Sequence, residues 1–381
     1  MYLIFILYFA AEGIIYPFWP VWLASHGYAN AEIGLLIAAS YWPQVIVAFS
    51  LAYAADRKFS QLRIAAASAL FSCLCLALFY RGDSFAAYLW LSIAFGGAWA
   101  AVLPLTESNL LSRDKAALAD YGYVRASGSI AFIALATGGG ILISGLGVSI
   151  VPGAVAALMG LTGLSCLRMS QGGQGKAGAS RRLARPSLLV TLRCRPIIAA
   201  ACAGSLIQVS HALYFAISSN AWKAVGYTPT EIGIFWAIAV LAEIIFFTAS
   251  GRILRFITPR KIIILSGVAA AARWILYSLD THLPIIILGQ ILHALSFAAY
   301  HVAMMRVFRD CAPADSSAIV QGIYYSFLVA LPMGLLTPLA GWTFDHVGKV
   351  AYLPMAILAV VGAVVAFAAL PRHRLGVSND G

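Results

Sequence analysis

GQILHALSFAAYHVAMMR, residues 289–306, is an apolar stretch that is long enough to cross a lipid bilayer as a helix. A helix rises ~1.5 Å per residue, so roughly 20 residues span the ~30 Å of hydrocarbon. The stretch nevertheless carries His293, His301 and Arg306. A helix surrounded by lipid tolerates such side chains only where each faces a cavity or a partner. The stretch therefore predicts a membrane protein with a polar site at mid-bilayer depth.

The composition of the whole chain agrees with a membrane location. Of 381 residues, 62% are hydrophobic and 10% are charged, and the mean hydropathy is +0.88. Soluble domains carry about 25% charged residues. The net charge of +11 comes from loop Lys and Arg without interleaved aromatic residues, which argues against a nucleic-acid partner. The six cysteines form no CxxC pair, so we expect no disulfide, metal site or cofactor.

Apolar segments of spanning length recur along the chain and predict an all-α integral membrane fold with twelve transmembrane helices. We expect these at 2–23, 32–55, 62–80, 85–111, 121–145, 148–168, 196–222, 230–254, 261–279, 283–308, 316–344 and 350–370. No Ser/His/Asp or HExxH arrangement is present in the sequence, so an enzyme is not indicated.

The positions of Lys and Arg predict the orientation. All but four of the 25 Lys and Arg residues fall on one side if the N-terminus is cytoplasmic. Arg81, Lys223 and Lys349 lie on the other side, and Arg273 lies within a span. Because cytoplasmic loops carry the excess of positive charge, both termini are expected inside the cell, in a bacterial inner membrane.

An internal repeat divides the chain. GYANAEIG at residues 27–34 recurs as GYTPTEIG at residues 226–233. A Gly-, Ser- and Arg-rich stretch lies between the copies and is typical of a flexible cytoplasmic linker. The sequence thus predicts six-helix bundles at 1–168 and 196–381, joined by a linker at 169–195. Two such halves are typical of transporters whose site lies at the repeat interface.

Eight ionisable side chains fall inside predicted spans, and we expect them to meet in one hydrated cavity because unpaired charge in lipid is costly. They are Glu12, Glu107, Arg125, His211, Glu243, Arg273, His293 and His301. Glu107 and Arg125 are predicted to pair between adjacent helices. At the spacing of the repeat, Glu12 corresponds to His211. A Glu243–Arg273 contact that opens would let the carboxylate capture a proton. The alternative is that these groups are static pairs that hold helices together.

Several motifs resemble the major facilitator superfamily, and within it the phenylpropionate permease group. They are YPFWPVWL (16–23), LPLTE (103–107), DYGYVRASGSIAF (120–132), VLAEIIF (240–246), ARW (272–274) and QILHA (290–294). The loop with Ala52, Asp56 and Arg57 resembles the superfamily signature between spans two and three, with Ala52 at a position that is usually Gly. The resemblance implies a gating role for Asp56 and Arg57.

The placement of charges also resembles that of lactose/proton symporters. By that resemblance, Glu107 and Arg125 bind substrate, and Glu243, Arg273 and His293 handle substrate and proton. Two positions depart from the pattern. Ser296 stands where the proton-carrying Glu is expected, so Glu243, His293 and Glu12 remain candidates for the carrier. Phe132 stands where the sugar-stacking Trp is expected, which favours an aromatic acid over a sugar.

These observations lead to one functional hypothesis with two alternatives. The first is symport of protons with a small organic solute, an aromatic carboxylate such as 3-phenylpropionate, by a monomer in the lipid bilayer. Its expected substrate-binding residues are Glu107, Arg125, Phe132, Glu12, His211 and Arg273, and its expected proton-coupling residues are Glu243, Arg273, His293 and His301. The alternatives are a sugar or nucleoside symporter, and an exporter or transport-inactive sensor.

Overall fold

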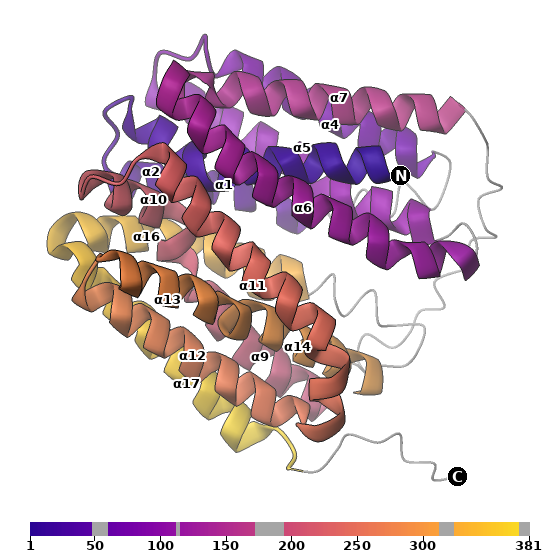
Figure 1. Ribbon diagram of the computed structural model, residues 1–381, viewed down its shortest axis with the longest axis vertical. Helices are drawn as coiled ribbons and strands as arrows, with labels where there is room; N and C mark the ends of the chain where they lie inside the picture. The colour runs from indigo at the N-terminus through magenta and orange to yellow at the C-terminus, as the bar shows by residue number, and fades with distance from the viewer. Residues whose placement is uncertain (48–59, 112–114, 172–193, 312–323, 373–381) are drawn as a thin grey trace. The chain divides into compact units, whose positions relative to one another are not determined.

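The computed structural model describes residues 1–47, 60–111, 115–171, 194–311 and 324–372, and its elements are all helical (Figure 1). The elements of the first half of the chain are α1 (Tyr2–Ala24), α2 (Asn30–Tyr41), α4 (Gln61–Leu78), α5 (Phe85–Leu111), α6 (Lys115–Leu146), η1 (Val148–Ile150) and α7 (Val151–Gln171). The elements of the second half are α9 (Arg195–Val209), α10 (Ala212–Ala224), α11 (Pro229–Phe256), α12 (Pro259–Leu279), α13 (Leu283–His293), η2 (Ala294–Ala299), α14 (Tyr300–Cys311), η3 (Tyr324–Ala330), α16 (Leu331–Val347), η4 (Gly348–Ala351) and α17 (Tyr352–Ala369).

Ten helical stretches of the described residues are long and apolar enough to cross a membrane. The last of them, Tyr324–Ala369, has 46 residues and turns at Gly348 (φ +59°), so it contains two of the predicted spans. The predicted span 32–55 is represented by α2, because residues 48–59 lie outside the described ranges. The predicted all-α membrane fold is confirmed.

Exposed surface on these helices is apolar, as expected for lipid contact. Trp90, Ile245 and Phe367 are 60% or more exposed, whereas the polar Arg273 and Gln290 are completely buried. A soluble protein would not leave so many large apolar side chains uncovered. Polar groups therefore gather inside the helical packing, where they find partners.

The described helices form two compact units. Unit 1 comprises Met1–Arg181, Phe215–Ala237 and Thr337–Asp345, and unit 2 comprises Arg182–Tyr214, Ile238–Leu336 and His346–Gly381. In unit 1, α1 packs against α6 and α7, and α5 packs against α2 and α4. In unit 2, α12 packs against α17, α13 and α14 (Figure 1). The predicted linker, 169–195, falls mostly on residues 172–193, outside the described part of the chain.

The two copies of the repeat adopt the same local structure. Gly27 and Gly226 both have positive φ, +84° and +105°, a conformation that favours glycine. Glu32 accepts a hydrogen bond from the backbone N–H of Ala29 at 2.9 Å. In the second copy, Glu231 accepts from the N–H of Thr228 at 2.7 Å. Each Glu satisfies a free N–H at the start of its helix, which explains why the motif keeps Gly and Glu at the same spacing.

Two predicted spans contain interruptions. The span 196–222 breaks at Ser210 and His211, between α9 and α10. The span 283–308 changes to a π-helix at Ala294–Ala299, directly after His293. A π-helical turn adds a residue to the local repeat and is frequent at functional sites. Both interruptions therefore place His211 and His293 at irregular backbone.

Candidate functional site

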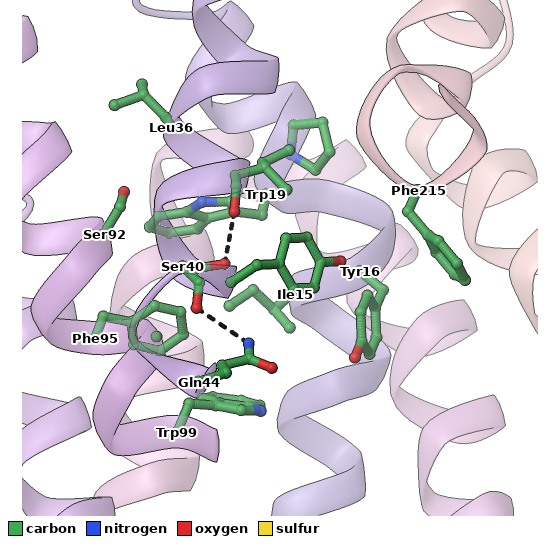
Figure 2. Close-up of a pocket in the computed structure, with 14 residues that line it drawn as sticks. Ile15, Tyr16, Trp19, Leu36, Ser40, Gln44, Ser92, Phe95, Trp99 and Phe215 are labelled. Atoms are coloured by element: carbon green, nitrogen blue, oxygen red, sulfur yellow. Dashed lines mark hydrogen bonds between the residues drawn. The ribbon is translucent and has the colours of Figure 1, made fainter. Parts of the chain in front are cut away.

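A cavity of about 100 Å³ lies in unit 1, between α1, α2 and α5, with Phe215 of α10 at one side (Figure 2). Its wall is largely aromatic, from Tyr16, Trp19, Phe95, Trp99 and Phe215. Two serines and a glutamine also line it: Ser40, Ser92 and Gln44. A dry cavity of ~150 Å³ accommodates benzene, so this cavity is smaller than the space known to hold one aromatic ring and would have to widen to take one.

The polar side of the cavity depends on a close approach of α2 and α5. A Cβ on Gly96 would overlap the carbonyl oxygen of Ser40, so only glycine permits this contact. The Ser40 hydroxyl donates to the carbonyl of Ile37 at 2.7 Å. The Gln44 amide donates to the Ser40 carbonyl at 3.0 Å (Figure 2). These bonds hold both side chains at the cavity wall and leave the Gln44 amide oxygen as an acceptor.

The aromatic wall of the cavity leads to a cluster of acids. The rings of Trp99 and Tyr8 lie 5.3 Å apart, and the Tyr8 hydroxyl is hydrogen-bonded to Glu12. Glu12 in turn interacts electrostatically with Arg125 and Glu107. The cavity wall thus leads through Tyr8 to Glu12, which lies within electrostatic range of Arg125 and Glu107, the two other charges predicted for substrate binding in this half.

Glu107 and Arg125 approach each other as the sequence predicts. The Arg125 Nε lies 4.0 Å from the Glu107 Oε1, and their side chains are 42% and 26% exposed. Tyr121 donates to the same Glu107 oxygen at 3.1 Å. The Arg125 guanidinium lies 4.2 Å from the centre of the Phe9 ring, and its Nη1 is buried without a hydrogen-bond partner among the described residues. Arg125 therefore keeps a donor for another acceptor.

Phe132 lies beside this region but does not line the cavity as the structure describes it. Its ring is 6.4 Å from that of Tyr16, which does line the cavity. A Cβ on Gly13 would lie 2.5 Å from the Phe132 carbonyl oxygen. The close backbone contact holds α6 against α1 and sets Phe132 behind Tyr16.

In unit 2, one histidine joins an acid and an arginine from separate helices. Glu243 on α11 lies 2.8 Å from Nε2 of His293, and these side chains are 15% and 5% exposed. Nδ1 of His293 lies 2.7 Å from Nη1 of Arg273 on α12. The sequence predicted a contact of Glu243 with Arg273. The structure places His293 between the two groups.

This geometry identifies the protonation state of His293. A guanidinium only donates hydrogen bonds, so Nδ1 must be the acceptor of the Arg273 bond. The ring proton is then on Nε2, where it donates to the Glu243 carboxylate. The three residues form one directed series of hydrogen bonds, from Arg273 through His293 to Glu243, in a buried setting where such bonds are strong.

Arg273 is enclosed on its other sides as well. Its Nη2 donates to the Gln290 amide oxygen at 2.9 Å, and that oxygen also accepts from Tyr214 at 3.2 Å. The guanidinium lies 4.1 Å from the centre of the Tyr214 ring and 4.7 Å from that of Trp274. Arg273 therefore has no exposed surface, and a role in substrate binding, which stays a prediction, would require its uncovering.

The two other predicted histidines occupy different places. His211 is fully buried; its Nδ1 lies 3.0 Å from the Ile207 carbonyl and its Nε2 lies 3.3 Å from the Ser296 hydroxyl. Its ring centre is 5.7 Å from that of His293, so it belongs to the same cluster. His301 instead lies 3.0 Å from the Tyr325 hydroxyl. Asp56 and Arg57, predicted to gate, lie outside the described residues.

Sequence reasoning missed several residues of both sites. One is Gln290, three positions before His293, and another is Tyr277, four positions after Arg273, whose ring centre lies 5.6 Å from the Arg273 guanidinium. Helical spacing could have indicated both. No comparable signal marks Ser40, Gln44 and Ser92, because single uncharged polar residues are common on helices that pack together in membranes.

Known proteins resemble this chain over nearly its full length. A probable 3-phenylpropionic acid transporter of Escherichia coli (strain K12) is 28% identical over 364 residues, which cover 93% of each chain. The maltose permease of Geobacillus stearothermophilus is 22% identical over 98% of this chain and 94% of its own. A crystal structure of the nucleoside transporter NupG superposes with a TM-score of 0.76 at 17% identity, covering 97% of this chain and 97% of that one.

These relatives and neighbours are transporters, not enzymes, and the helices described above have the corresponding membrane fold. The "MFS_1 like family" model matches residues 1–355. The chain is therefore a multi-pass membrane transporter that belongs to the MFS_1-like family.

Proposed function

We propose that this protein is a proton-coupled symporter that carries a small aromatic carboxylate, such as 3-phenylpropionate, across the bacterial inner membrane by alternating access. The observation that carries the proposal is the aromatic cavity of unit 1, whose wall leads through Tyr8 and Glu12 toward Arg125, an arginine with an unused donor. The name of the Escherichia coli relative supports the same substrate class.

The substrate side of the proposal follows from the chemistry of an aromatic acid. Its ring needs an apolar wall, and Trp19, Phe95 and Trp99 supply one. Aromatic pairs contribute ~0.5–1.5 kcal/mol beyond the burial of their area. Its carboxylate needs a cation, and a guanidinium binds a carboxylate with strong, directed hydrogen bonds. In our proposal Arg125 exchanges its long 4.0 Å contact with Glu107 for the substrate carboxylate.

The proton side of the proposal rests on the series Arg273–His293–Glu243. As long as Arg273 donates to Nδ1 of His293, that nitrogen has no lone pair free for a second proton. Glu243 is then the group of the series that accepts a proton. Protonation removes its charge and weakens the charge-assisted bond from His293, since such bonds are roughly twice as strong as neutral ones. The contact between α11 and α13 would loosen, which couples proton uptake to helix movement.

Sugar or nucleoside symport is the second candidate function. The specific observation behind it is the set of polar groups at the cavity, Ser40, Gln44 and Ser92, since hydroxyl-rich substrates need donors and acceptors. The similar proteins include a maltose permease and a nucleoside transporter. An exporter or a transport-inactive sensor is a third candidate, which the test below separates by direction and by flux.

Uptake into liposomes tests the proposal. Purified protein would be reconstituted and given labelled 3-phenylpropionate, maltose or uridine, with and without an inward proton gradient. We expect accumulation of the aromatic acid only, and only with the gradient. Gradient-driven accumulation of maltose or uridine would instead support the second candidate. Binding of a compound without flux would support the sensor.

A variant of the arginine separates substrate recognition from folding. Arg125→Gln removes the cation, and loss of a charged hydrogen bond of ~1.5–3 kcal/mol should weaken 3-phenylpropionate binding by on the order of tenfold or more. Binding would be measured calorimetrically in detergent. Arg81→Gln is the control, because Arg81 is exposed just after α4 and does not line the cavity. Wild-type affinity in Arg125→Gln would refute the proposed carboxylate site.

A further inference from the structure

A second cavity, of about 580 Å³, lies in unit 2 where three helix ends meet. It is lined by the start of α9 (Arg195), the start of α12 (Arg260) and the end of α17 with the residues that follow, up to Arg372. Three of its nine lining residues are arginines and none is acidic. Like charges brought together in this way repel each other, so the cavity is complementary to an anion.

Arg260 is held in position inside this cavity. Its Nη2 donates to the carbonyl of Phe367 at 2.6 Å, and its guanidinium lies 4.8 Å from the centre of the Phe367 ring. The carbonyl is one of the last in α17, where free acceptors favour a cation. The Nε of Arg260 is buried without a hydrogen-bond partner among the described residues. Arg195 and Arg372 are exposed.

The chemistry of the three arginines favours a phosphate group. A guanidinium presents its donors in a planar fork that matches two phosphate oxygens, and arginine is for this reason the usual residue for phosphate recognition. One guanidinium fixed against α17 and two exposed ones at the rim together suit a compact anion that accepts several hydrogen bonds.

The helix that leads to the cavity indicates what carries the phosphate. α17 presents a continuous row of exposed apolar side chains at helical spacing that ends at Phe367 in the cavity wall. The row consists of Leu353, Ile357, Val360, Val361, Val364 and Phe367. An acyl chain lying along this row would bring its headgroup to the arginines. A free phosphate would make no use of the row.

We propose that this cavity binds the headgroup of an anionic phospholipid, with the phosphate held by Arg195, Arg260 and Arg372 and an acyl chain along α17. By the positive-inside distribution of the chain, the lipid belongs to the cytoplasmic leaflet, which is also the leaflet whose anionic lipids attract basic residues. The site is separate from the cavity of unit 1 and from the Glu243 series, and it does not depend on the transported substrate.

Lipid retention by the intact protein tests this site. Full-length protein would be reconstituted in nanodiscs of equal parts phosphatidylglycerol and phosphatidylcholine, extracted, and examined by native mass spectrometry. We expect wild type to retain phosphatidylglycerol, and each arginine removed to lower retention about fivefold. The test variant is Arg195→Gln/Arg372→Gln, which leaves the Arg260 contact to α17 intact. The control is Arg63→Gln/Arg252→Gln, two exposed arginines that do not line the cavity.

Each result has a defined meaning. Selective loss in the test variant, with wild-type retention in the control variant, supports the site. Equal loss in both variants means that lipid follows total charge, and it refutes the site. Equal retention of the two lipids by wild type also refutes it. In a parallel arm, inorganic phosphate that displaces phosphatidylglycerol at low millimolar concentration would show a free-phosphate site and refute the lipid assignment.

Discussion

Arg273 illustrates how a single buried cation is stabilised in a membrane protein. It has no exposed surface, and an isolated charge in such a place would be very costly. Its guanidinium donates from Nη1 to His293 and from Nη2 to Gln290, and the Tyr214 ring covers one face. Each contact uses a different part of the planar guanidinium group. The stability of this site therefore depends on arginine itself more than on the presence of a positive charge.

Replacing this arginine by lysine should therefore destabilise the protein although the charge is kept. Arg273→Lys offers one compact ammonium in place of two separated donors, and we expect a loss of ~1.5–3 kcal/mol from the charged hydrogen bond that is not replaced. The midpoint of thermal unfolding in detergent measures it. Arg309→Lys is the control, because Arg309 is 67% exposed and should change stability by less than ~0.5 kcal/mol. Equal unfolding midpoints of Arg273→Lys and wild type would contradict this role of the guanidinium group.

If Glu243 carries the proton, as we propose, its replacement should separate transport from coupling. In Glu243→Gln the amide oxygen still accepts the bond from His293, but the side chain takes up no proton. We expect substrate exchange across liposomes to continue at near the wild-type rate and proton-driven accumulation to be lost. Glu231→Gln is the matched control, since Glu231 caps the start of α11 on the same helix. Full accumulation by Glu243→Gln would remove Glu243 as the proton carrier.

At the scale of elements, small residues decide where helices meet. Gly34 packs against the backbone of Thr337 in α16, and Gly233, its equivalent in the repeat, packs against that of Ala136 in α6. Gly96 does the same for α2 and α5 next to the cavity. Close backbone contacts of this kind replace the hydrophobic effect, which does not drive helices together in lipid.

The contact at Gly96 provides a direct test of how α2 and α5 shape the cavity. Gly96→Ala places a methyl group against the Ser40 carbonyl oxygen, closer than atoms can approach, so the helices must separate, at a cost of ~1–3 kcal/mol. Gly138→Ala in α6 meets nothing within 4 Å and should leave stability unchanged or raise it by up to ~1 kcal/mol. Thermal unfolding and 3-phenylpropionate binding, measured on both variants, should both decline only in Gly96→Ala. Unchanged binding there would exclude α2 from the site.

At the scale of the whole molecule, the two halves of the sequence share a repeated helix start but place different polar residues on the helices that follow it. The first copy of the repeat begins a helix that supplies Ser40 to the cavity. The second begins α11, which supplies Glu243 to the histidine series. Duplication of an ancestral unit followed by divergence of its polar residues would explain how one copy could come to bind a solute and the other a proton, as we propose.

The orientation of the whole chain is testable without a structure. The positive-inside distribution predicts that both termini are cytoplasmic. A fluorescent protein fused after residue 381 should fluoresce in bacterial cells, and alkaline phosphatase at the same place should be inactive. Alkaline phosphatase fused after residue 226 should be active, because the second repeat copy is expected on the opposite side. The reverse pattern would contradict the orientation and invert the proposed direction of transport.

The fold could be predicted from the sequence because its causes are local. Spanning length and hydropathy identify helices such as α1 and α5, and the Gly27 and Gly226 motifs mark equivalent helix starts, since each depends on nearby residues. The candidate charges, including Glu107, Arg125, Glu243 and Arg273, were also recognisable, because charge within an apolar span is rare.

Only the tertiary structure decided which of those charges touch. His293 lies between Glu243 and Arg273 because α11, α12 and α13 pack with a particular rotation and depth. The sequence of one helix does not determine how a neighbouring helix is rotated against it. The cavity at Ser40 and Trp99 and the arginine cavity at the end of α17 arise in the same way, from side chains on separate helices. Helix formation is governed by short-range interactions, whereas a site depends on long-range packing, so the sequence determined the elements and their order while the packing determined the contacts.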